Sequence, residues 1–331
     1  MKFRLVVCLF LGLSCLPLNA ERPSPPGNFS FWGEYLYLKP SIDQSFFALV
    51  QEDLDNDTFT SGTTQRFNNP YGFGSAWRVG GEYASCDAIN DIHIEGTYLH
   101  RKAHREVSGS FVSAVDYFPS IGTVGAGSAI SNNEFTYYAI DLLFGHSLYN
   151  CCPFTLYIEG GAQFMHLNAE KKTQINNPAI PGVTIPSAKD HNWALGPEVG
   201  AEVTYQLPFC SENHFFSLIA KGRGALLVNR THFKLNQIVN TSTLNRQLNF
   251  DNDPHYRIVP FGDIRLGIEY CSIPCGCRSL LLNIEIGYEF MTYNRLVDWV
   301  HFDATSNTGS SFDNYSDFDL QGPYIAVKIS F

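Results

Sequence analysis

The last ten residues of the sequence, Gly322 to Phe331, alternate between two kinds of side chain. One face carries Ile325, Val327, Ile329 and Phe331, and the other carries Ala326, Lys328 and Ser330. Successive side chains of an extended chain point to opposite faces, so this pattern predicts a β-strand with one apolar face. The strand ends on an aromatic residue with no polar tail after it. Any fold of this chain must therefore find an apolar environment for one face of its last strand.

The first twenty residues have the features of a secretory signal peptide. Lys2 and Arg4 precede an apolar run from Leu5 to Leu13, and Leu18-Asn19-Ala20 is a plausible cleavage site. A lipoprotein signal at Cys15 is disfavoured, because Leu13 stands at the wrong distance from that cysteine. We expect an exported protein in which residues 1–20 are removed, residues 21–28 form a Pro-rich periplasmic lead, and residues 29–331 form the folded domain.

The net charge and the lack of a long apolar run exclude two classes of protein. Without Lys2 and Arg4, the 22 basic residues become 20 against 32 acidic ones, which is a net charge of −12. Such acidity argues against a nucleic-acid partner. After the signal, no apolar run approaches the roughly 20 residues that a membrane helix needs. If the chain spans a membrane, it must do so as a closed barrel, because lipid cannot satisfy open sheet edges.

The alternation recurs along the chain and predicts about ten strands. Aromatic residues make up 14% of the chain, and 27 glycines stand against only 3 methionines, which favours strands and turns over helices. The predicted strands cover residues 31–38, 77–83, 92–98, 138–145, 156–163, 195–205, 216–223, 257–270, 280–290 and 322–331. Long polar connections at 40–71, 101–132, 170–191, 231–254 and 292–317 alternate with short turns at 86–90, 150–153, 207–213 and 271–277.

This asymmetry of connections predicts an all-β fold. It is typical of a single up-and-down antiparallel transmembrane β-barrel of about 10 strands (10–12), with short periplasmic turns and long extracellular loops. A soluble barrel would show the same period with its apolar side inward. The export signal, the terminal Phe331 and strands long enough to cross an apolar band of about 25 Å favour the outer membrane. Aromatic residues near strand ends fit interfacial girdles, or ordinary core packing: Trp77, Tyr98, Trp193, Tyr205, Phe215, Tyr270 and Phe290.

If the apolar face meets lipid, the opposite face of the strands lines the lumen. Its charged side chains are Arg78, Glu82, His93, Glu95, Asp141, Glu159, Glu198, Glu202, Lys221, Arg223, Arg257, Asp263, Arg265, Glu269, Glu285, Glu289 and Lys328. All of these except His93, Glu269 and Lys328 are our pore-lining candidates. A lumen of about ten strands is narrow, since open channels are typical of 16 to 18 strands. The charges either line a passage for small solutes and ions, which we favour slightly, or pair with one another and close it.

With the strands placed, the sequence resembles the major outer membrane protein family of Legionella and the Chlamydia-like bacteria. The resembling stretches are Gly33 to Pro40, Trp77 to Gly80, Ile94 to Tyr98, Tyr138 to Leu142, Gly196 to Gly200 and Ile286 to Glu289. The resemblance implies an abundant outer-membrane barrel with porin or surface-interaction roles. It also implies that Phe331 is part of the signal read by the barrel-insertion machinery. It offers no catalytic residues to transfer.

Seven cysteines remain after the signal, and each lies in or beside a short turn. They are Cys86, Cys151, Cys152, Cys210, Cys271, Cys275 and Cys277. All would face the periplasm, an oxidising compartment, and an odd number leaves at least one thiol for a partner or free. We expect intra- and intermolecular disulfides that cross-link the protein to itself or to other envelope proteins, as the resemblance to chlamydial surface proteins suggests. A zinc site at Cys271, Cys275 and Cys277 is disfavoured, because no His follows at ligand spacing.

No catalytic, metal or cofactor motif stands out. The ten histidines form no HExxH pair, and no nucleophile and base can be placed from spacing alone. We therefore expect no enzyme and no cofactor. Three hypotheses remain in decreasing order: a porin-like channel that is also an abundant envelope component, a non-conducting structural or adhesive protein cross-linked through its periplasmic turns, and a barrel enzyme.

Overall fold

The computed structural model describes most of the chain from residue 29 onward. The described residues are 29–42, 46–53, 62–68, 71–85, 89–109, 111–114, 127–151, 153–176, 182–208, 214–241, 245–272, 280–302 and 311–331. The strands are β1 (Phe29–Ile42), β2 (Phe46–Asp53), β3 (Gly62–Asn68), β4 (Gly74–Ala84), β5 (Asn90–Gly109), β6 (Phe111–Ala114), β7 (Gly127–Cys151), β8 (Phe154–Asn176), β9 (Gly182–Gln206), β10 (His214–Thr241), β11 (Asn245–Asp251), β12 (His255–Ser272), β13 (Leu281–Phe302) and β14 (Ser311–Ser330). The predicted signal peptide and periplasmic lead lie outside the described residues.

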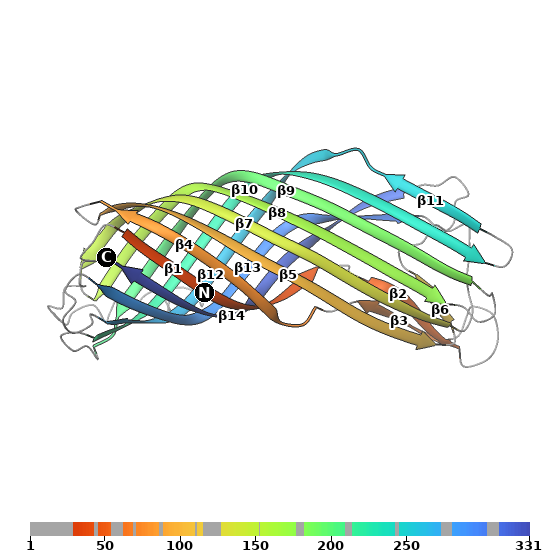
Figure 1. The fold of residues 1–331 in the computed structure, drawn as a ribbon, viewed down its shortest axis with the longest axis horizontal. Helices are drawn as coiled ribbons and strands as arrows, with labels where there is room; N and C mark the ends of the chain where they lie inside the picture. Colours follow the sequence, from red (N-terminus) through yellow and green to blue (C-terminus); the bar gives the residue numbers. More distant parts are fainter. Residues whose placement is uncertain are drawn as a thin grey trace, which may run out of the picture.

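Ten of these strands close into a single barrel (Figure 1). Going round the ring, the order is β1, β4, β5, β7, β8, β9, β10, β12, β13 and β14, and β14 pairs with β1 to complete it. Neighbouring strands are antiparallel, and β11 pairs with the part of β10 from Lys234 to Asn240, beyond the part that pairs with β12. No helix among the described residues is long and apolar enough to cross a bilayer. The predicted all-β barrel of about ten strands is confirmed.

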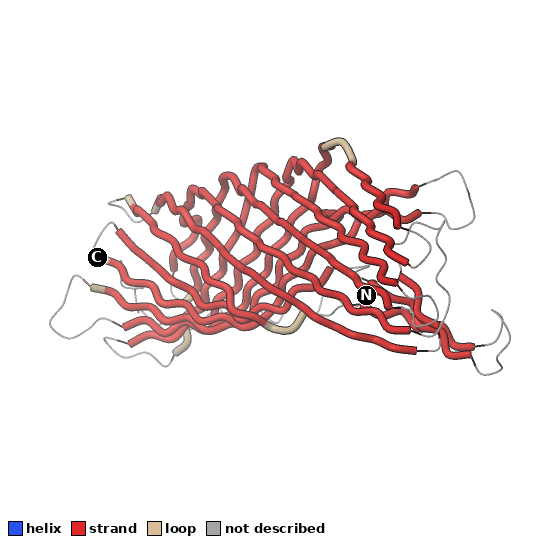
Figure 2. Tube along the Cα trace, turned by 45° about the vertical axis from the view of Figure 1, so that its right-hand side comes forward, coloured by secondary structure: helices blue, strands red, loops and turns tan. Residues whose placement is uncertain are grey.

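The strands extend well beyond the predicted ones on the side of the long connections. Most residues of the five polar stretches that the sequence analysis assigns to long loops are strand in the described chain. Figure 2 shows that nearly all of the described chain is strand. For example, β5 continues to Gly109 and β10 continues to Thr241. The loop prediction was wrong here because both faces of a strand can be polar once it leaves the apolar band, so the alternation that marks a strand is lost.

The apolar face of the strands points outward. On β10, Phe216, Leu218, Leu226 and Val228 are exposed, whereas the residues between them are mostly buried in the lumen. The next four outward side chains after Val228, from Arg230 to Asn236, are polar, so Val228 marks the upper limit of the lipid-facing band on this strand. Six of the seven predicted girdle aromatics alternate outward. The seventh, Phe215, has the inward register, and its neighbour Phe216 is the outward one.

A second, smaller sheet covers part of the barrel's inner wall at the end opposite the short turns. It has the order β3-β2-β6, and its apolar side packs against inward residues of β5, β7 and β8 (Figure 1). The buried cluster between the two sheets contains Ala48, Val50, Val107, Val112, Ala129 and Ile175. This packing explains why the strands of this wall remain ordered above the membrane: their inner face has an apolar partner there.

Two glycines of the wall allow close approach between neighbouring strands. A Cβ at Gly161 would lie 2.0 Å from the carbonyl oxygen of Leu142, and one at Gly196 would lie 2.0 Å from that of Leu226. Backbone atoms cannot move aside as a flexible side chain can, so these positions require glycine if the strongly coiled ring is to close.

Candidate functional site: the barrel lumen

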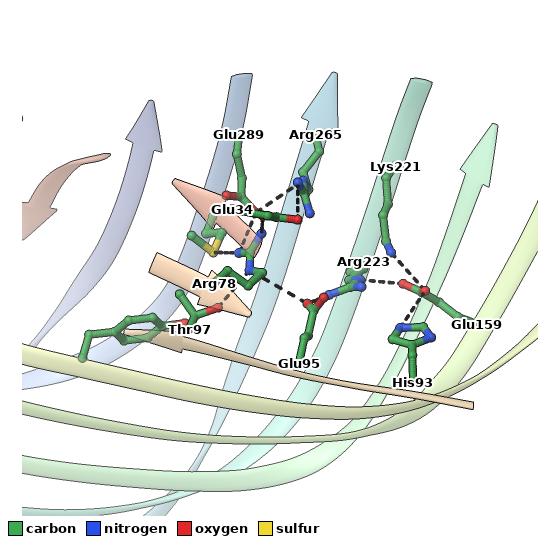
Figure 3. A network of polar contacts seen from close by, with 12 residues as sticks. Glu34, Arg78, His93, Glu95, Thr97, Glu159, Lys221, Arg223, Arg265 and Glu289 are labelled. Atoms are coloured by element: carbon green, nitrogen blue, oxygen red, sulfur yellow. Dashed lines mark hydrogen bonds and ion pairs between the residues drawn. The ribbon is translucent and has the colours of Figure 1, made fainter. Parts of the chain in front are cut away.

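In its half nearer the short turns, the lumen is crossed by a network of ion pairs, which we call the charged layer (Figure 3). Its members come from seven strands of the ring and point toward one another. They are Glu34, Arg78, His93, Glu95, Thr97, Glu159, Lys221, Arg223, Arg265 and Glu289. All of them are buried except Lys221, which is half-buried.

Arg78 of β4 organises one half of the charged layer. Its guanidinium donates to Glu34 at 2.9 Å and to Glu289 at 2.8 Å, and its Nε donates to the Thr97 hydroxyl at 2.9 Å. Arg265 of β12 reaches the other oxygen of Glu34 at 3.1 Å. The planar guanidinium can serve several acceptors in fixed directions, and this makes arginine suited to a shared buried site.

Arg223 of β10 organises the other half. It donates to Glu159 of β8 at 2.5 Å and also to Glu95 of β5. Lys221 lies 3.1 Å from Glu159, and the two halves meet where Arg78 Nε lies 4.0 Å from Glu95. Three strands of the ring separate β5 from β10 on one side and five on the other. The contact between Arg223 and Glu95 therefore spans the lumen from wall to wall.

The balance of the charged layer leans toward acid. Asp141, Glu198 and Asp263 are also buried at this height, and several of their oxygens have no hydrogen-bond partner among the described residues: Asp141 Oδ1, both carboxylate oxygens of Glu198, and Asp263 Oδ1. Buried charges are tolerated only when they are paired. The arginines are therefore the groups on which the rest of the layer depends.

A second closure, which we call the apolar layer, lies above the charged layer on the side of the long connections. At its centre the hydroxyls of Tyr137 and Tyr293 are hydrogen-bonded at 2.7 Å. Their strands, β7 and β13, have four ring strands between them in either direction, so this contact crosses the full diameter. Buried side chains packed around the pair include Leu36, Leu99, Phe135, Met165, Leu167, Leu227, Phe261, Met291 and Phe318.

A polar cluster follows still higher in the lumen. The carboxylate of Asp190 accepts from Asn192 at 2.7 Å, from Thr231 at 3.0 Å and from the backbone N–H of Asp298 at 3.0 Å. Asp298 in turn pairs with Arg257. Arg257 is therefore separated from the other pore-lining candidates by the apolar layer.

Below the charged layer, the lumen opens into a cavity of about 310 Å³ at the end of the short turns. Glu82, Glu202 and Glu285 line it, and Lys328 lies 2.6 Å from Glu82. Cys271 and Trp32 also contribute to its wall. Since short turns lie on the periplasmic side of such barrels, this cavity faces the periplasm.

The fourteen pore-lining candidates all lie on the inner side of the wall, but they do not line one continuous passage. Those in or beside the charged layer are Arg78, Glu95, Asp141, Glu159, Glu198, Lys221, Arg223, Asp263, Arg265 and Glu289. Glu82, Glu202 and Glu285 belong to the periplasmic cavity, and Arg257 belongs to the upper cluster.

Five of the lumen residues that sequence reasoning missed make central contacts. Glu34 was detectable, since it stands between the outward Gly33 and Tyr35 of a predicted strand. Tyr137 was one residue before the start of its predicted strand. Tyr293, Asp190 and Asp298 fell in predicted loops, where no alternation signalled their inward direction.

Of the seven cysteines predicted to lie in or beside short turns, only Cys271 has its side chain among the described residues. Cys271, near the end of β12, is buried and points into the periplasmic cavity. Cys151 lies in β7, without a described side chain, and Cys86, Cys152, Cys210, Cys275 and Cys277 lie outside the described residues. Among the described residues, no group of His, Cys, Asp and Glu is arranged to hold a metal ion.

Phe331 lies at the same end of the barrel. Its backbone N–H donates to Phe29 at 2.9 Å, and its ring, which is 52% exposed, stands 6.4 Å from that of Phe31.

Residues 21–331 match the family described as Legionella pneumophila major outer membrane protein precursor. No curated protein matches the chain. The outer membrane protease OmpT of Escherichia coli is similar in structure at 9% identity and a TM-score of 0.44, covering 92% of this chain and 97% of that one. The toluene transporter TodX of P. putida is similar at 8% identity and a TM-score of 0.29, covering 93% of this chain and 91% of that one. A FadL homologue of Pseudomonas aeruginosa is similar at 6% identity and a TM-score of 0.28, covering 92% of this chain and 90% of that one. These scores carry no functional argument.

Proposed function

Because the chain belongs to the family of the Legionella pneumophila major outer membrane protein and lies in a bacterial outer membrane, we propose that it is a structural, surface-displayed barrel whose lumen does not conduct. The observation that carries the proposal is the pair of wall-to-wall contacts, Arg223 with Glu95 and Tyr137 with Tyr293. An ion crossing the lumen would have to break both. Apart from these two tyrosine hydroxyls, the side chains that we name in the apolar layer are apolar, so desolvating a charge there is costly.

A solute-permeability experiment tests this proposal. The refolded protein is placed in liposomes, and the rate of swelling in small sugars is measured, with heat-modifiable gel mobility as proof of insertion. We expect liposomes that contain inserted wild-type protein to swell no faster than empty liposomes. A variant with Glu95→Ala, Arg223→Ala, Tyr137→Ala and Tyr293→Ala, opened at both layers, serves as the positive control. Swelling by the wild type at the rate of the opened variant would reject the proposal.

A porin-like channel is the second candidate, and the periplasmic cavity favours it. The cavity of about 310 Å³ is water-accessible and carries charges of both signs, as a vestibule for small solutes and ions would. A channel would require both layers to rearrange. Voltage steps across a planar bilayer distinguish the two candidates, because a gated porin opens in steps whereas a structural barrel stays silent at every potential.

Cross-linking through the periplasmic turns belongs to the same structural proposal. Seven cysteines follow the predicted signal peptide, each in or beside a stretch that the sequence predicts to be a short turn, and an oxidising periplasm permits disulfides there. We expect a ladder of higher-mass species on non-reducing gels of isolated envelopes that collapses to one band with reductant. A single band in both lanes would remove the cross-linking part and leave the closed barrel in place.

The exposed ring of Phe331 supports its proposed role as part of the insertion signal. Because Phe331 is 52% exposed, the insertion machinery can reach its ring. Phe331→Ala is expected to lower the amount of heat-modifiable protein in outer membranes by severalfold. Phe29→Ala, which removes a neighbouring exposed ring, is the control and should assemble normally.

A further inference from the structure

The outer surface of β9 and β10 carries a group of basic residues just above the lipid-facing band. This group, the basic stripe, consists of Lys189, His191, Arg230, His232 and Lys234, all on the outward register. It begins where the exposed Trp193, Leu195 and Val228 end the lipid-facing surface. The chain has a net charge of −10, so this concentration of positive charge runs against the rest of the molecule.

The register of the two strands places like charges directly opposite one another. Lys189 pairs across the ladder with Lys234, and His191 pairs with His232. Like charges in such positions destabilise a sheet. The next outward pair completes the stripe, with Arg230 standing 5.6 Å over the ring of Trp193. A sheet that keeps two lysines directly opposite one another has a reason to hold them together, and an anion bound between them is a direct one.

Acidic residues flank the stripe without covering it. Glu170 of β8 lies 3.2 Å from Lys189, and Asp251 of β11 lies 2.9 Å from Lys234 and 2.7 Å from His232. These hydrogen bonds from Lys234 and His232 lower the pKa of Asp251. The two lysine side chains nevertheless remain 48% and 47% exposed. Each ammonium has three donors, so donors remain for an outside acceptor.

The height of the stripe identifies its surroundings. Aromatic residues of outer-membrane barrels sit at the membrane interfaces, and Trp193 is such a residue at the upper limit of the band. Side chains within four residues above it on β9, and opposite them on β10, therefore stand at the level of the lipid headgroups. Because the stripe faces away from the lumen, a headgroup of the outer leaflet is what meets it.

We propose that the basic stripe binds the phosphate of a phosphorylated lipid headgroup in the outer leaflet. Lys189 and Lys234 hold the phosphate between them as point charges, and Arg230, stacked on Trp193, donates from the membrane side. The acyl chains of the same lipid lie along the exposed Leu195 and Val228. This arrangement accommodates a lipid and not only an anion, since the charged and apolar parts of one molecule each meet a matching surface.

The test compares lipids that differ only in phosphate. The wild type and K189Q/K234Q are refolded in neutral detergent micelles, lipid A is titrated, and the bound lipid is counted by native mass spectrometry. The second lipid is lipid A from which both phosphates have been removed, and the third titrant is inorganic phosphate. One basic residue near an anionic lipid surface contributes about fivefold in affinity. We therefore expect the double variant to bind lipid A about 25-fold more weakly.

The chain offers a matched control in Lys102 on β5. It is an outward lysine four residues above the exposed Tyr98, as Lys189 is four residues from Trp193, and it pairs with Glu134 at 3.0 Å. K102Q should bind lipid A as the wild type does, and heat-modifiable mobility shows that each variant is folded. Equal binding by K189Q/K234Q and wild type, or equal binding of the dephosphorylated lipid, would overturn the proposal. The proposal would also be overturned if inorganic phosphate bound as tightly as lipid A, because the site would then bind a free anion and not a lipid.

Discussion

The charged layer and the apolar layer close the same barrel by opposite physical means. The charged layer joins the walls through arginines, each shared by two or more carboxylates, and the apolar layer fills the same cross-section with packed side chains around one hydroxyl pair. In the first, every member depends on a partner of opposite charge. In the apolar layer, the members fill the cross-section by packing and need no partner of opposite charge. The two layers should therefore respond differently to the same kind of substitution.

The largest effect is expected from Arg78→Ala, which leaves Glu34 and Glu289 buried with less compensating charge. Removing one partner of a buried ion pair costs about 3–5 kcal/mol. Guanidinium unfolding of the refolded protein in micelles measures the change in the free energy of unfolding. Lys102→Ala, at an exposed ion pair, should change it by less than about 1 kcal/mol. A loss at Arg78 no larger than the loss at Lys102 would show that the charged layer is not held by its arginines.

A smaller loss is expected when volume is removed from the apolar layer. Leu227 is fully buried there, and Leu227→Ala should cost about 3 kcal/mol through lost burial and the cavity left behind. Leu226, its exposed neighbour on the same strand, provides the control in Leu226→Ala. Added salt should leave the Leu227 loss unchanged and reduce the Arg78 loss only slightly, because that loss involves charge but burial limits screening. Equal losses at Leu226 and Leu227 would contradict a packed layer.

The smallest effect is expected at the tyrosine pair. Tyr137→Phe keeps the ring and removes one hydroxyl, which should cost about 1 kcal/mol, and Tyr293→Phe added to it should cost little more because the two hydroxyls serve each other. A double-mutant cycle by the same unfolding measurement gives the coupling between them. Fully additive losses would mean that the hydroxyls do not bond to one another in the membrane-inserted protein.

The two layers also differ in how much of each could be predicted from the sequence. Period-two alternation was enough to predict the barrel, because a lipid-facing surface forces apolar residues onto every second position, as from Ile284 to Phe290. The same alternation assigned the inward charges to the lumen. It could not pair them, since the contact of Glu95 with Arg223 depends on ring closure between strands distant in sequence.

The apolar layer could not be predicted from the sequence for a different reason. Tyr137 and Tyr138 are adjacent and chemically identical, and only the strand register decides that the first enters the lumen and the second meets the membrane. Tyr293 lies just past the strand predicted to end at Phe290. An apolar residue that points inward breaks the alternation of apolar and polar residues that identifies strands. A lumen filled by apolar side chains therefore cannot be predicted from this alternation.

Single-channel recording in a planar lipid bilayer tests the closed lumen most directly. Wild-type protein, shown to be inserted by its heat-modifiable mobility, is recorded beside the variant opened at both layers. The closed lumen predicts no discrete current steps from the wild type at any applied potential, and stable steps from the opened variant. Stable current steps from the inserted wild type, of the size seen for the opened variant, would contradict it and establish a conducting barrel.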